Sequence, residues 1–532
     1  MLFLIWTVVL FATLYLYLRR VYTKFSASGV KNLPTIPLLG NLLPILLRRR
    51  HLAEDMDFYY NQFPDERFVG RFEFVNPIVM VRDLDLIKRI TIKDFEYFLD
   101  HRGFTDEKVE PLFGRNLFSL KGDEWKDMRS TLSPAFTSSK IRLMVPFMEE
   151  AGNQMIAALM KKTAETGPIQ VECKDLTSRY ANDVIASCAF GLKVDSHLDA
   201  NSTFYEKGKT ASSFKMRQML MFFAYSAFPS IVKRLKLTLF SKDTTNFFIS
   251  LVLDTMKNRE ENNIIRPDMI HLLMELSHNF LITELLILLL MFNISLYFAL
   301  LKMYHKMKMT IFSEWSDTDL VAQAVLFFIG GFETISIGMS FTLYELALHP
   351  EVQERLAQEI KETHSKSEGK LDFDLIQNMQ YLDMVISEVL RLWPPGILLD
   401  RICCKDYNMG KPNKYEKRDF ILRKGDLIAI PVFSIHRDAK YFPEPEKFNP
   451  ERFSDENKHL INSMTYMPFG FGPRNCIGSR FALLEIKMLI YQVLLRMEVS
   501  PCEKTCIPSK LSPETTNLKL VGDHWLNFKI RQ

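Results

Sequence analysis

The chain has 532 residues and a formal net charge of +4, with 47% hydrophobic and 24% charged residues. This composition allows a large core and excludes a largely disordered chain. The small charge, without interleaved basic and aromatic residues, does not favour nucleic-acid binding. The seven cysteines are odd in number and scattered, so they predict a reducing, cytosol-facing compartment rather than a disulfide framework.

An uncharged apolar run opens the chain over residues 1–18, and Arg19, Arg20 and Lys24 follow it. As a helix the run would span roughly 27 Å, about the hydrocarbon thickness of a bilayer. Cations after the run favour a retained signal anchor, with the body on the cytosolic side, over a cleaved signal peptide. We therefore expect an anchor over 1–18, a basic and proline-rich connector over 19–45, and a catalytic domain over 46–532.

The body is predicted to be one large, mainly α-helical domain with a smaller β-rich region, an α+β fold. Short β-branched runs between about 31 and 100 break at Asn76-Pro77 and indicate a small sheet. From about 120 to 395 the pattern is mostly helical, and short strands with Pro and Gly follow over 396–450. No internal repeat and no long Gly/Ser linker divides this body.

The clearest helix lies between Ser316, a predicted N-cap with Asp319 three residues on, and Pro350. Within it, the adjacent glycines of the stretch GGFET cost about 1 kcal/mol each relative to alanine. Either close helix packing compensates for them, or they let a flat cofactor and a small molecule approach the backbone. The next residues, Glu333 and Thr334, set a carboxylate beside a hydroxyl, as proton delivery to a buried oxygen species requires.

An apolar segment precedes that helix and does not fit an ordinary domain. Residues 280–301 carry one charge, Glu284, and are as apolar as the N-terminal run. A second membrane span here would separate the motifs before and after it on opposite sides of the bilayer. Three interpretations of the insert at about 280–310 remain open. It is a loop lying on the membrane or on the domain surface, a mis-joined exon, or a true second span.

Two further motifs follow the long helix. Glu388 and Arg391 share one face of an apolar helix that ends at Pro394-Pro395, and burial there would favour a third partner such as Arg452. The stretch FGFGPRNCIGSR then surrounds Cys476 with glycines and an arginine, just before a final amphipathic helix. Three roles are open for Cys476: a spare buried thiol, a nucleophile or a metal ligand. A nucleophilic cysteine would need a nearby base, and the loop contains no histidine.

Taken together, these motifs resemble the cytochrome P-450 superfamily of haem-thiolate monooxygenases, over about residues 30–530 apart from 275–312. The resemblance implies haem b (iron protoporphyrin IX), with Cys476 as the thiolate axial ligand of the iron. The haem-binding signature F-G-x-G-x-R-x-C-x-G falls at Phe469, Gly470, Gly472, Arg474, Cys476 and Gly478.

The resemblance also assigns roles elsewhere in the chain. Gly331, Glu333 and Thr334 match the oxygen-activation motif, in which Gly330 replaces the usual alanine. Trp125 and Arg129, unless they are an exposed stacked pair, would meet a haem propionate. The other implied residues are Arg401 and Arg474 at the propionates, His101 and Arg102 as weaker candidates there, and Glu388, Arg391 and Arg452 as a structural triad.

Substrate contacts are expected from Phe118, Phe327, Ile329 and residues 396–399. Residues 212–231 are either a lid over the substrate entrance or a core helix rich in Met and Phe. The pattern is most like insect microsomal members that metabolise xenobiotics.

We therefore expect a monooxygenase of the endoplasmic reticulum membrane that inserts one atom of O₂ into a lipophilic substrate, in xenobiotic detoxification or in lipid or hormone metabolism. Electrons would come from NADPH through a separate reductase, with a cytochrome b-type protein as a second donor, because the chain has no dinucleotide fingerprint. Lys126, Arg480 and Lys487 are predicted to guide this acidic partner. The alternatives are a haem-thiolate isomerase and a non-catalytic haem-binding protein.

Overall fold

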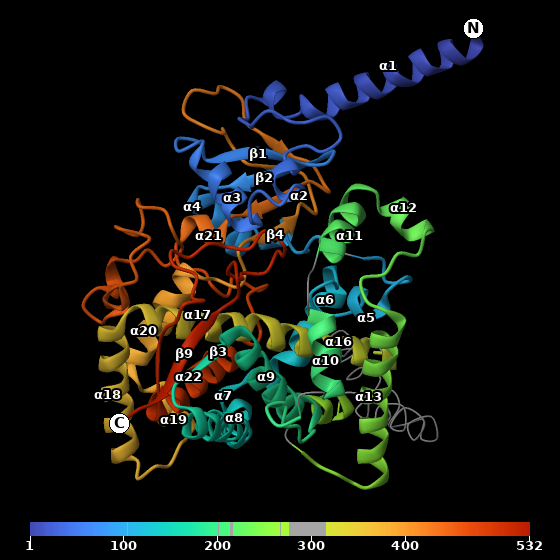
Figure 1. The fold of residues 1–532 in the computed structure, drawn as a ribbon. Helices are drawn as coiled ribbons and strands as arrows, with labels where there is room; N and C mark the ends of the chain where they lie inside the picture. The colour runs from blue at the N-terminus through green and yellow to red at the C-terminus, as the bar shows by residue number, and fades with distance from the viewer. Residues whose placement is uncertain (104, 200–201, 213–215, 267, 276–314) are drawn as a thin grey trace, which may run out of the picture.

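The computed structural model describes residues 1–103, 105–199, 202–212, 216–266, 268–275 and 315–532. Within these ranges the body is mainly α-helical and carries three small sheets, as the sequence predicts. The first helix projects from one end of the body, next to the strands β1 and β2 (Figure 1). The apolar insert at 280–310 lies outside the described residues.

The helices come in two groups, before and after the apolar insert. The first group is α1 (Leu2–Tyr22), α2 (Leu43–Leu46), α3 (Leu52–Asn61), α4 (Leu84–Lys88), α5 (Pro111–Gly114), α6 (Gly122–Leu132), α7 (Ser138–Arg142), α8 (Val145–Thr166), α9 (Cys173–Ile185), α10 (Thr203–Ser212), α11 (Met216–Ala227), α12 (Pro229–Arg234) and α13 (Lys242–Glu261). The second group is α16 (Asp317–Ile329), α17 (Ile335–Leu348), α18 (Pro350–Lys366), α19 (Phe373–Gln377), α20 (Gln380–Leu392), α21 (Val432–Ile435) and α22 (Ser479–Arg496).

Short 3₁₀ and π turns join these helices. The 3₁₀ turns are η1 (Ser26–Ser28), η3 (Phe95–Tyr97), η4 (Ser133–Phe136), η7 (Pro450–Phe453) and η8 (Lys458–Leu460). The π turns are η2 (Arg89–Lys93), η5 (Ala186–Phe190) and η6 (Gly330–Thr334), of which η6 interrupts the long central helix.

The largest sheet has the strand order β1-β2-β7-β4. β1 (Phe68–Glu73) and β2 (Asn76–Val81) form an antiparallel hairpin in the predicted small sheet, and the turn falls before Asn76 rather than at Asn76-Pro77. β7 (Leu427–Ile430) runs parallel to β2, and β4 (Leu399–Ile402) is antiparallel to β7. Arg401 in β4 pairs with Ile428, and this register fixes where its side chain enters the body. The second sheet joins β3 (Ile169–Glu172), β9 (Trp525–Ile530) and β8 (Met497–Pro501), and β5 (Tyr407–Asn408) pairs with β6 (Ile421–Leu422).

The N-terminal helix is longer than the predicted anchor and has no buried residue. It continues past residue 18 to Tyr22, whose hydroxyl donates to the carbonyl of Phe74 at 3.1 Å. Lys24 then pairs with Asp426 at 2.7 Å, and Phe25 is fully buried against the first sheet. The connector is therefore docked on the sheet, so packing of the body begins before residue 46.

The long helix predicted between Ser316 and Pro350 is confirmed as one helical run of 32 residues. Ser316 caps it, in a reciprocal capping box with Asp319. Almost every residue of α17 is buried, so this run is apolar because it crosses the core, as Figure 1 shows. The predicted final amphipathic helix is α22, which ends at Arg496 because Met497 begins β8.

Of the segment 212–231, residues 216–231 lie in a surface element rather than in a core helix. In α11, Met219 and Phe223 pack with Leu42 and Ile45 in a small separate cluster. Leu220, at 44% exposure, faces outward. This packing on the periphery disfavours the core-helix interpretation of the segment.

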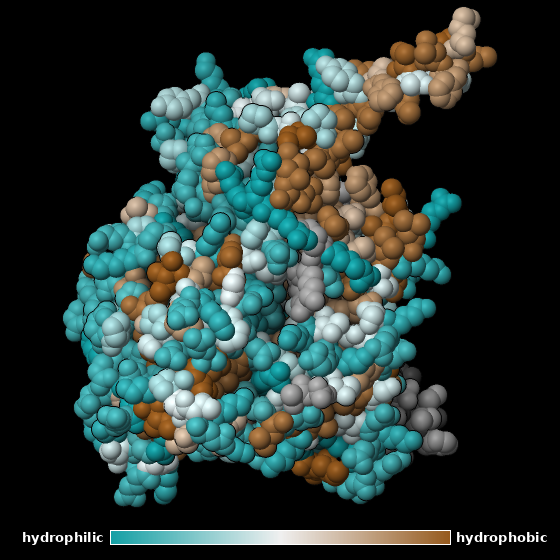
Figure 2. All heavy atoms as spheres, in the orientation of Figure 1, coloured by the Kyte–Doolittle hydropathy of each residue, from teal (hydrophilic) through white to brown (hydrophobic). Residues whose placement is uncertain are grey.

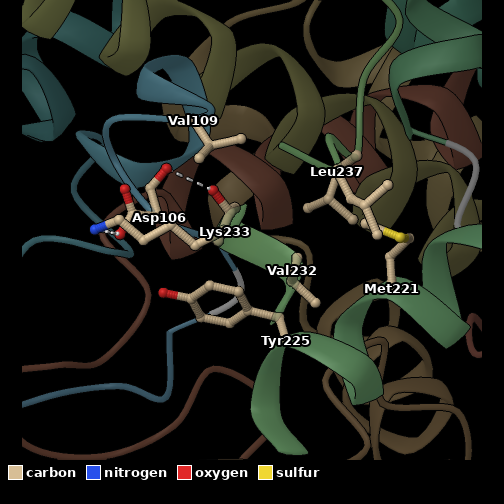
Figure 3. A pocket seen from close by; sticks show the side chains of 9 residues that line it. Asp106, Val109, Met221, Tyr225, Val232, Lys233 and Leu237 are labelled. Carbon is tan, nitrogen blue, oxygen red and sulfur yellow. Dashed lines mark hydrogen bonds and ion pairs between the residues drawn. The ribbon is translucent and has the colours of Figure 1, made fainter. Parts of the chain in front are cut away.

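An ion pair joins this surface element to the loop before α5. Asp106 and Lys233 lie 2.8 Å apart beside a small hollow of about 10 Å³, which Tyr225 and Met221 also line (Figure 3). The loop and α12 are thereby held together at the surface of the body.

Candidate active site

The cysteine loop is a tight turn that ends at the first residue of α22. Gly470 and Gly472 have φ angles of +72° and +70°, which favour glycine. A Cβ on Gly472 would also lie 1.8 Å from the carbonyl oxygen of Thr91, so the loop packs directly on the backbone of η2. The Cys476 N–H donates to Phe469 O at 2.9 Å and closes the turn.

The thiol of Cys476 borders an open space although protein surrounds it closely. The residue is exposed, whereas Arg474 beside it is buried. Burial raises the pKa of the Cys476 thiol, and the Gly478 N–H and the positive charge of Arg129 oppose this rise. A metal bound to the sulfur would favour the thiolate further, because a coordinating thiol is deprotonated.

Arg474 ties the loop to the segment that runs from Leu99 to Leu120. Its Nε donates to Leu99 O and its Nη2 to Leu120 O, both at 2.8 Å. The guanidinium also lies 4.0 Å from the ring centroid of Trp125, which is itself buried. Burial and the nearby charge of Arg401 lower the pKa of Arg474 to about 9.

Arg129 and Arg401 add two more cations around the loop. Arg129 donates to Asn475 O and Asn475 Oδ1, both at 2.9 Å, so it is bound to the residue next to Cys476. Arg401 is 1% exposed, and its Nε has no hydrogen-bond partner among the described residues. Burial lowers the pKa of the Arg401 guanidinium, and the negative charge of Asp400 opposes this lowering. A buried guanidinium with an unused donor is suited to an anionic group of a ligand.

His101 and Arg102, the weaker propionate candidates, have other partners. His101 hydrogen bonds Asp400 at 3.0 Å and stacks on Phe118, with the ring centroids 4.4 Å apart. Arg102 pairs with Glu73 at 2.6 Å.

The predicted triad is brought together in the core. Glu388 and Arg391 are both fully buried, with Arg391 Nε 2.7 Å from Glu388 Oε2. Arg452 Nε lies 3.3 Å from the other carboxylate oxygen, to which the Asn449 N–H also donates at 2.9 Å. Arg391 further donates to His436 O at 2.8 Å. A buried charge pair with its hydrogen bonds satisfied in this way fixes one arrangement of these segments.

The acid and the alcohol of the long helix bond different partners. The Thr334 hydroxyl donates to Gly330 O at 2.6 Å, and Thr334 is exposed in the middle of the helix. Glu333 instead lies 3.1 Å from Lys174 Nζ and accepts from Asn517 Nδ2 at 2.9 Å. A cavity of about 330 Å³, mostly lined by charged and polar side chains, lies beside Glu333.

Phe136 connects the long helix with the cysteine loop. Its ring centroid lies 5.1 Å from that of Phe327, and its Cε1 is 3.6 Å from where a Cβ on Gly478 would stand. Of the predicted substrate residues, Phe118 and Phe327 are partly buried, whereas Ile329 belongs to the core. The exposed side of α16 and η6 therefore lies close to the loop that carries Cys476.

Three residues at this site were missed by the sequence analysis. Lys174 and Asn517 come from α9 and from the loop before β9, far in sequence from Glu333, and no local pattern marks them. Phe136 lies in an ordinary Ser-Pro-Ala-Phe turn. The expectation that Lys487 meets a partner is wrong, because its side chain is 2% exposed and pairs with Asp383 at 2.7 Å.

A mainly α fold with a glycine-rich cysteine loop before its last long helix is the arrangement of the haem-thiolate enzymes. A family model described as "Cytochrome P450" matches residues 31–522. The chain therefore belongs to the cytochrome P450 family and is a haem-thiolate monooxygenase.

Three similar curated proteins come from insects and are matched over nearly their whole length. The chain is 44% identical to "Cytochrome P450 9e2" of Blattella germanica over 520 residues, 95% of this chain and 94% of that protein. It is 42% identical to "Probable cytochrome P450 9f2" of Drosophila melanogaster over 512 residues, with the same coverage. It is 36% identical to "Cytochrome P450 6k1" of Blattella germanica over 522 residues, 97% of this chain and 94% of that protein.

The residues at the site fit a haem group. A soft sulfur ligand is accessible on Cys476, as iron ligation requires. The unused donor of buried Arg401, near Arg474, suits a carboxylate such as a propionate.

Proposed function

We propose that Cys476, as a thiolate, is the axial ligand of the haem iron, and that Trp125, Arg129, Arg401, Phe469, Arg474 and Gly478 hold the cofactor. The observation that carries this proposal is the accessible sulfur in a closed turn beside three arginines. The bound haem supplies the chemistry that activates O₂ with two electrons. The Gly478 N–H and Arg129 stabilise the negative sulfur, because both lower its pKa.

On the long helix, Thr334 and Glu333 divide the handling of protons between them. Thr334 exposes its hydroxyl on the side of the helix near the cysteine loop, where it holds a proton close to the reacting oxygen. Glu333 lies beside the polar cavity and takes up protons there. Lys174 and Asn517 hold its carboxylate at that position.

The substrate is a lipophilic small molecule that enters from the membrane. α1 is long and apolar enough to cross a bilayer. Brown apolar atoms continue from its base over the neighbouring body in Figure 2. Among the described residues of the body, Leu38, Phe228, Ile231 and Leu235 are between 41% and 62% exposed. A hollow of about 250 Å³ next to this surface includes Asp426, the partner of Lys24. We place the protein on the endoplasmic reticulum membrane with its body in the cytosol, in xenobiotic or lipid metabolism.

Electrons come from NADPH through a separate reductase, with a cytochrome b-type protein as a second donor. Lys126 is exposed on α6, the helix that also carries Trp125 and Arg129, and Arg480 is exposed in the first turn of α22, directly after the cysteine loop. Cations at these positions attract an acidic partner. Lys126 also lies 3.2 Å from Glu96, so it is partly neutralised.

A reduced carbon-monoxide difference spectrum of membranes that contain the whole chain tests this assignment. The wild type should give the red-shifted Soret band of thiolate ligation, and Cys476→Ala should abolish it. Cys502→Ala, which changes a partly buried cysteine in another loop, is the matched control and should keep the band. A wild type with only an imidazole-like band, or a Cys476→Ala variant that keeps the thiolate band, would refute the assignment.

A further inference from the structure

The loop between β5 and β6, residues 411–418, presents a cluster of cations at the surface and is called the basic loop below. Its four exposed cations, which form no ion pair with any described residue, are Lys411, Lys414, Lys417 and Arg418. The single acid of the loop, Glu416, is turned toward the chain. Its carboxylate accepts the Lys417 N–H at 3.0 Å, and its Oε2 would lie 2.0 Å from a Cβ on Gly29. The positive charges are therefore left uncompensated toward solvent.

Hydrogen bonds hold the basic loop in one shape. Asn413 is buried, and its Nδ2 donates to a carboxylate oxygen of Glu66 at 2.8 Å. The Asn413 Oδ1 accepts the Tyr415 N–H at 2.9 Å, and the Arg67 N–H donates to Pro412 O at 2.9 Å. The backbone that carries the cations is thus ordered before any partner arrives, so little further ordering opposes binding.

An aromatic side chain stands among these cations. Tyr415 is 76% exposed, and Lys414 Nζ lies 5.0 Å from the centroid of its ring. No packing in the described body accounts for such an exposed ring. Tyrosine between exposed lysines is a composition that suits the boundary between water and lipid, where the ring lies at the level of the headgroups.

The basic loop lies beside the base of the membrane helix. The Arg418 Nη2 donates to Ala27 O at 3.4 Å, and Ala27 follows the end of α1 at Tyr22 by five residues. Even a fully extended chain would cover only about 18 Å over that stretch. Arg19 and Arg20, exposed in the last turn of α1, add to the positive charge at this end of the body. Figure 1 shows the orange loop and the blue base of α1 together at the top.

We propose that the basic loop binds anionic lipid headgroups of the membrane that holds α1. The four cations contact the phosphate and carboxylate groups of the lipids, and Tyr415 lies among the headgroups. The cytosolic leaflet carries the anionic lipids, and each basic residue close to it adds to the attraction. This second contact fixes the tilt of the body on the membrane, which the single helix α1 leaves free. The inference rests on the proposed placement of the protein on the membrane.

The test measures how well lipid protects the loop in the full chain. The protein is reconstituted in vesicles of phosphatidylcholine with or without about 30% phosphatidylserine, and chymotrypsin cleavage after Tyr415 is followed by mass spectrometry. Cleavage should be slower by about fivefold or more on the anionic vesicles, and about 0.5 M salt should remove the difference. Leu198 is the control site. It is 77% exposed between α9 and α10, which lie away from α1 in Figure 1, and its cleavage should not depend on the lipid.

Two matched variants assign the effect to the loop. The loop variant combines Lys414→Gln, Lys417→Gln and Arg418→Gln. It should be cut after Tyr415 at the same rate on both kinds of vesicle, within about twofold. The control variant removes three exposed cations of α8 and α13 through Lys161→Gln, Lys162→Gln and Lys257→Gln. It should keep the full difference of the wild type, and both variants should keep the carbon-monoxide band.

Equal cleavage of the wild type after Tyr415 on neutral and anionic vesicles would overturn the proposal while leaving the anchor in place. A loop variant that keeps the full difference would overturn it as well. Protection that appears only after an acidic flavoprotein reductase is added would assign the loop to a protein partner instead of lipid. A full chain that stays in the supernatant with both kinds of vesicle would refute the membrane placement itself, and the lipid contact with it.

Discussion

The triad around Glu388 and the turn at Gly330–Thr334 are built in opposite ways. In the triad, Glu388 and Arg391 are fully buried, and each of their charged groups contacts more than one partner. In the turn, Thr334 is exposed and the Glu333 carboxylate pairs with Lys174 of another helix. The triad is therefore fixed by desolvated charge, whereas the polar side chains of the turn stay partly or fully exposed.

Breaking the triad should have the largest effect. In Arg391→Met, the Glu388 carboxylate keeps its burial and loses its main counter-charge, which costs about 3–5 kcal/mol. We expect membranes that contain this variant to show little or no thiolate carbon-monoxide band.

The exposed pair of Lys458 and Asp455, 2.5 Å apart, is the control for the triad. Lys458→Met changes a solvated charge in the same part of the chain and should leave the band and the thermal inactivation temperature unchanged. An Arg391→Met protein with a normal band and normal stability would contradict the structural role of the triad.

Glu333→Gln should affect catalysis without affecting the fold. The amide keeps the size of the side chain and cannot carry a proton, so product formed per NADPH consumed should fall about 10- to 100-fold. The carbon-monoxide band should stay normal. Glu362→Gln, at an exposed position in α18, is the control and should keep full coupling. Full coupling in Glu333→Gln would remove this carboxylate from the proposed proton route.

Acidification should lower the stability of the protein, and His436, which contacts Arg391 of the triad, should account for part of the loss. This histidine is buried against Arg391 O and the Met467 N–H, and burial lowers its pKa to about 3 from an ordinary value of 6.5. Its contribution to stability is therefore complete above pH 6.5. As the pH falls toward 3 that contribution is lost, by up to about 1.4 kcal/mol per pH unit, because only the unfolded chain takes up the proton.

The measurement is the apparent unfolding temperature between pH 7.5 and 5.5. His436→Gln should have a shallower pH dependence than the wild type, while His459→Gln, at an exposed position, should match the wild type. Other buried histidines, such as His524, also have a lowered pKa, so part of the pH dependence of the unfolding temperature remains in every variant. Identical slopes in His436→Gln and the wild type would show that His436 is not the group that responds.

Lys174→Met should have the smallest effect, and it tests whether the ion pair of Glu333 matters for turnover. Removing the cation frees the Glu333 carboxylate from its ion pair, and Asn517 remains to hold it. We expect a change of a few fold in turnover and a normal carbon-monoxide band. Arg179→Met, a cation of the same helix that pairs with Asp175 rather than Glu333, is the control. A loss as large as that of Glu333→Gln would mean that Lys174 itself carries the proton.

Local sequence was sufficient wherever a residue's role depends on its neighbours along the chain. The capping box at Ser316, the length of the central helix and the tight turn around Cys476 were all predictable, because caps, glycine conformations and helical periodicity act over a few residues. The pairing of Glu388 with Arg391 at a spacing of three residues was predictable for the same reason.

The tertiary structure alone decided which partners meet from distant segments. Lys174 and Asn517 reach Glu333 from 159 and 184 residues away, and Lys487 is turned inward to Asp383, although all three appear as ordinary polar residues in the sequence. The same holds for the two adjacent glycines of η6, which are equivalent in sequence until α9 places Ile185 against Gly331. Burial and contact depend on the packing of whole helices, and no short stretch of sequence records where another helix will lie.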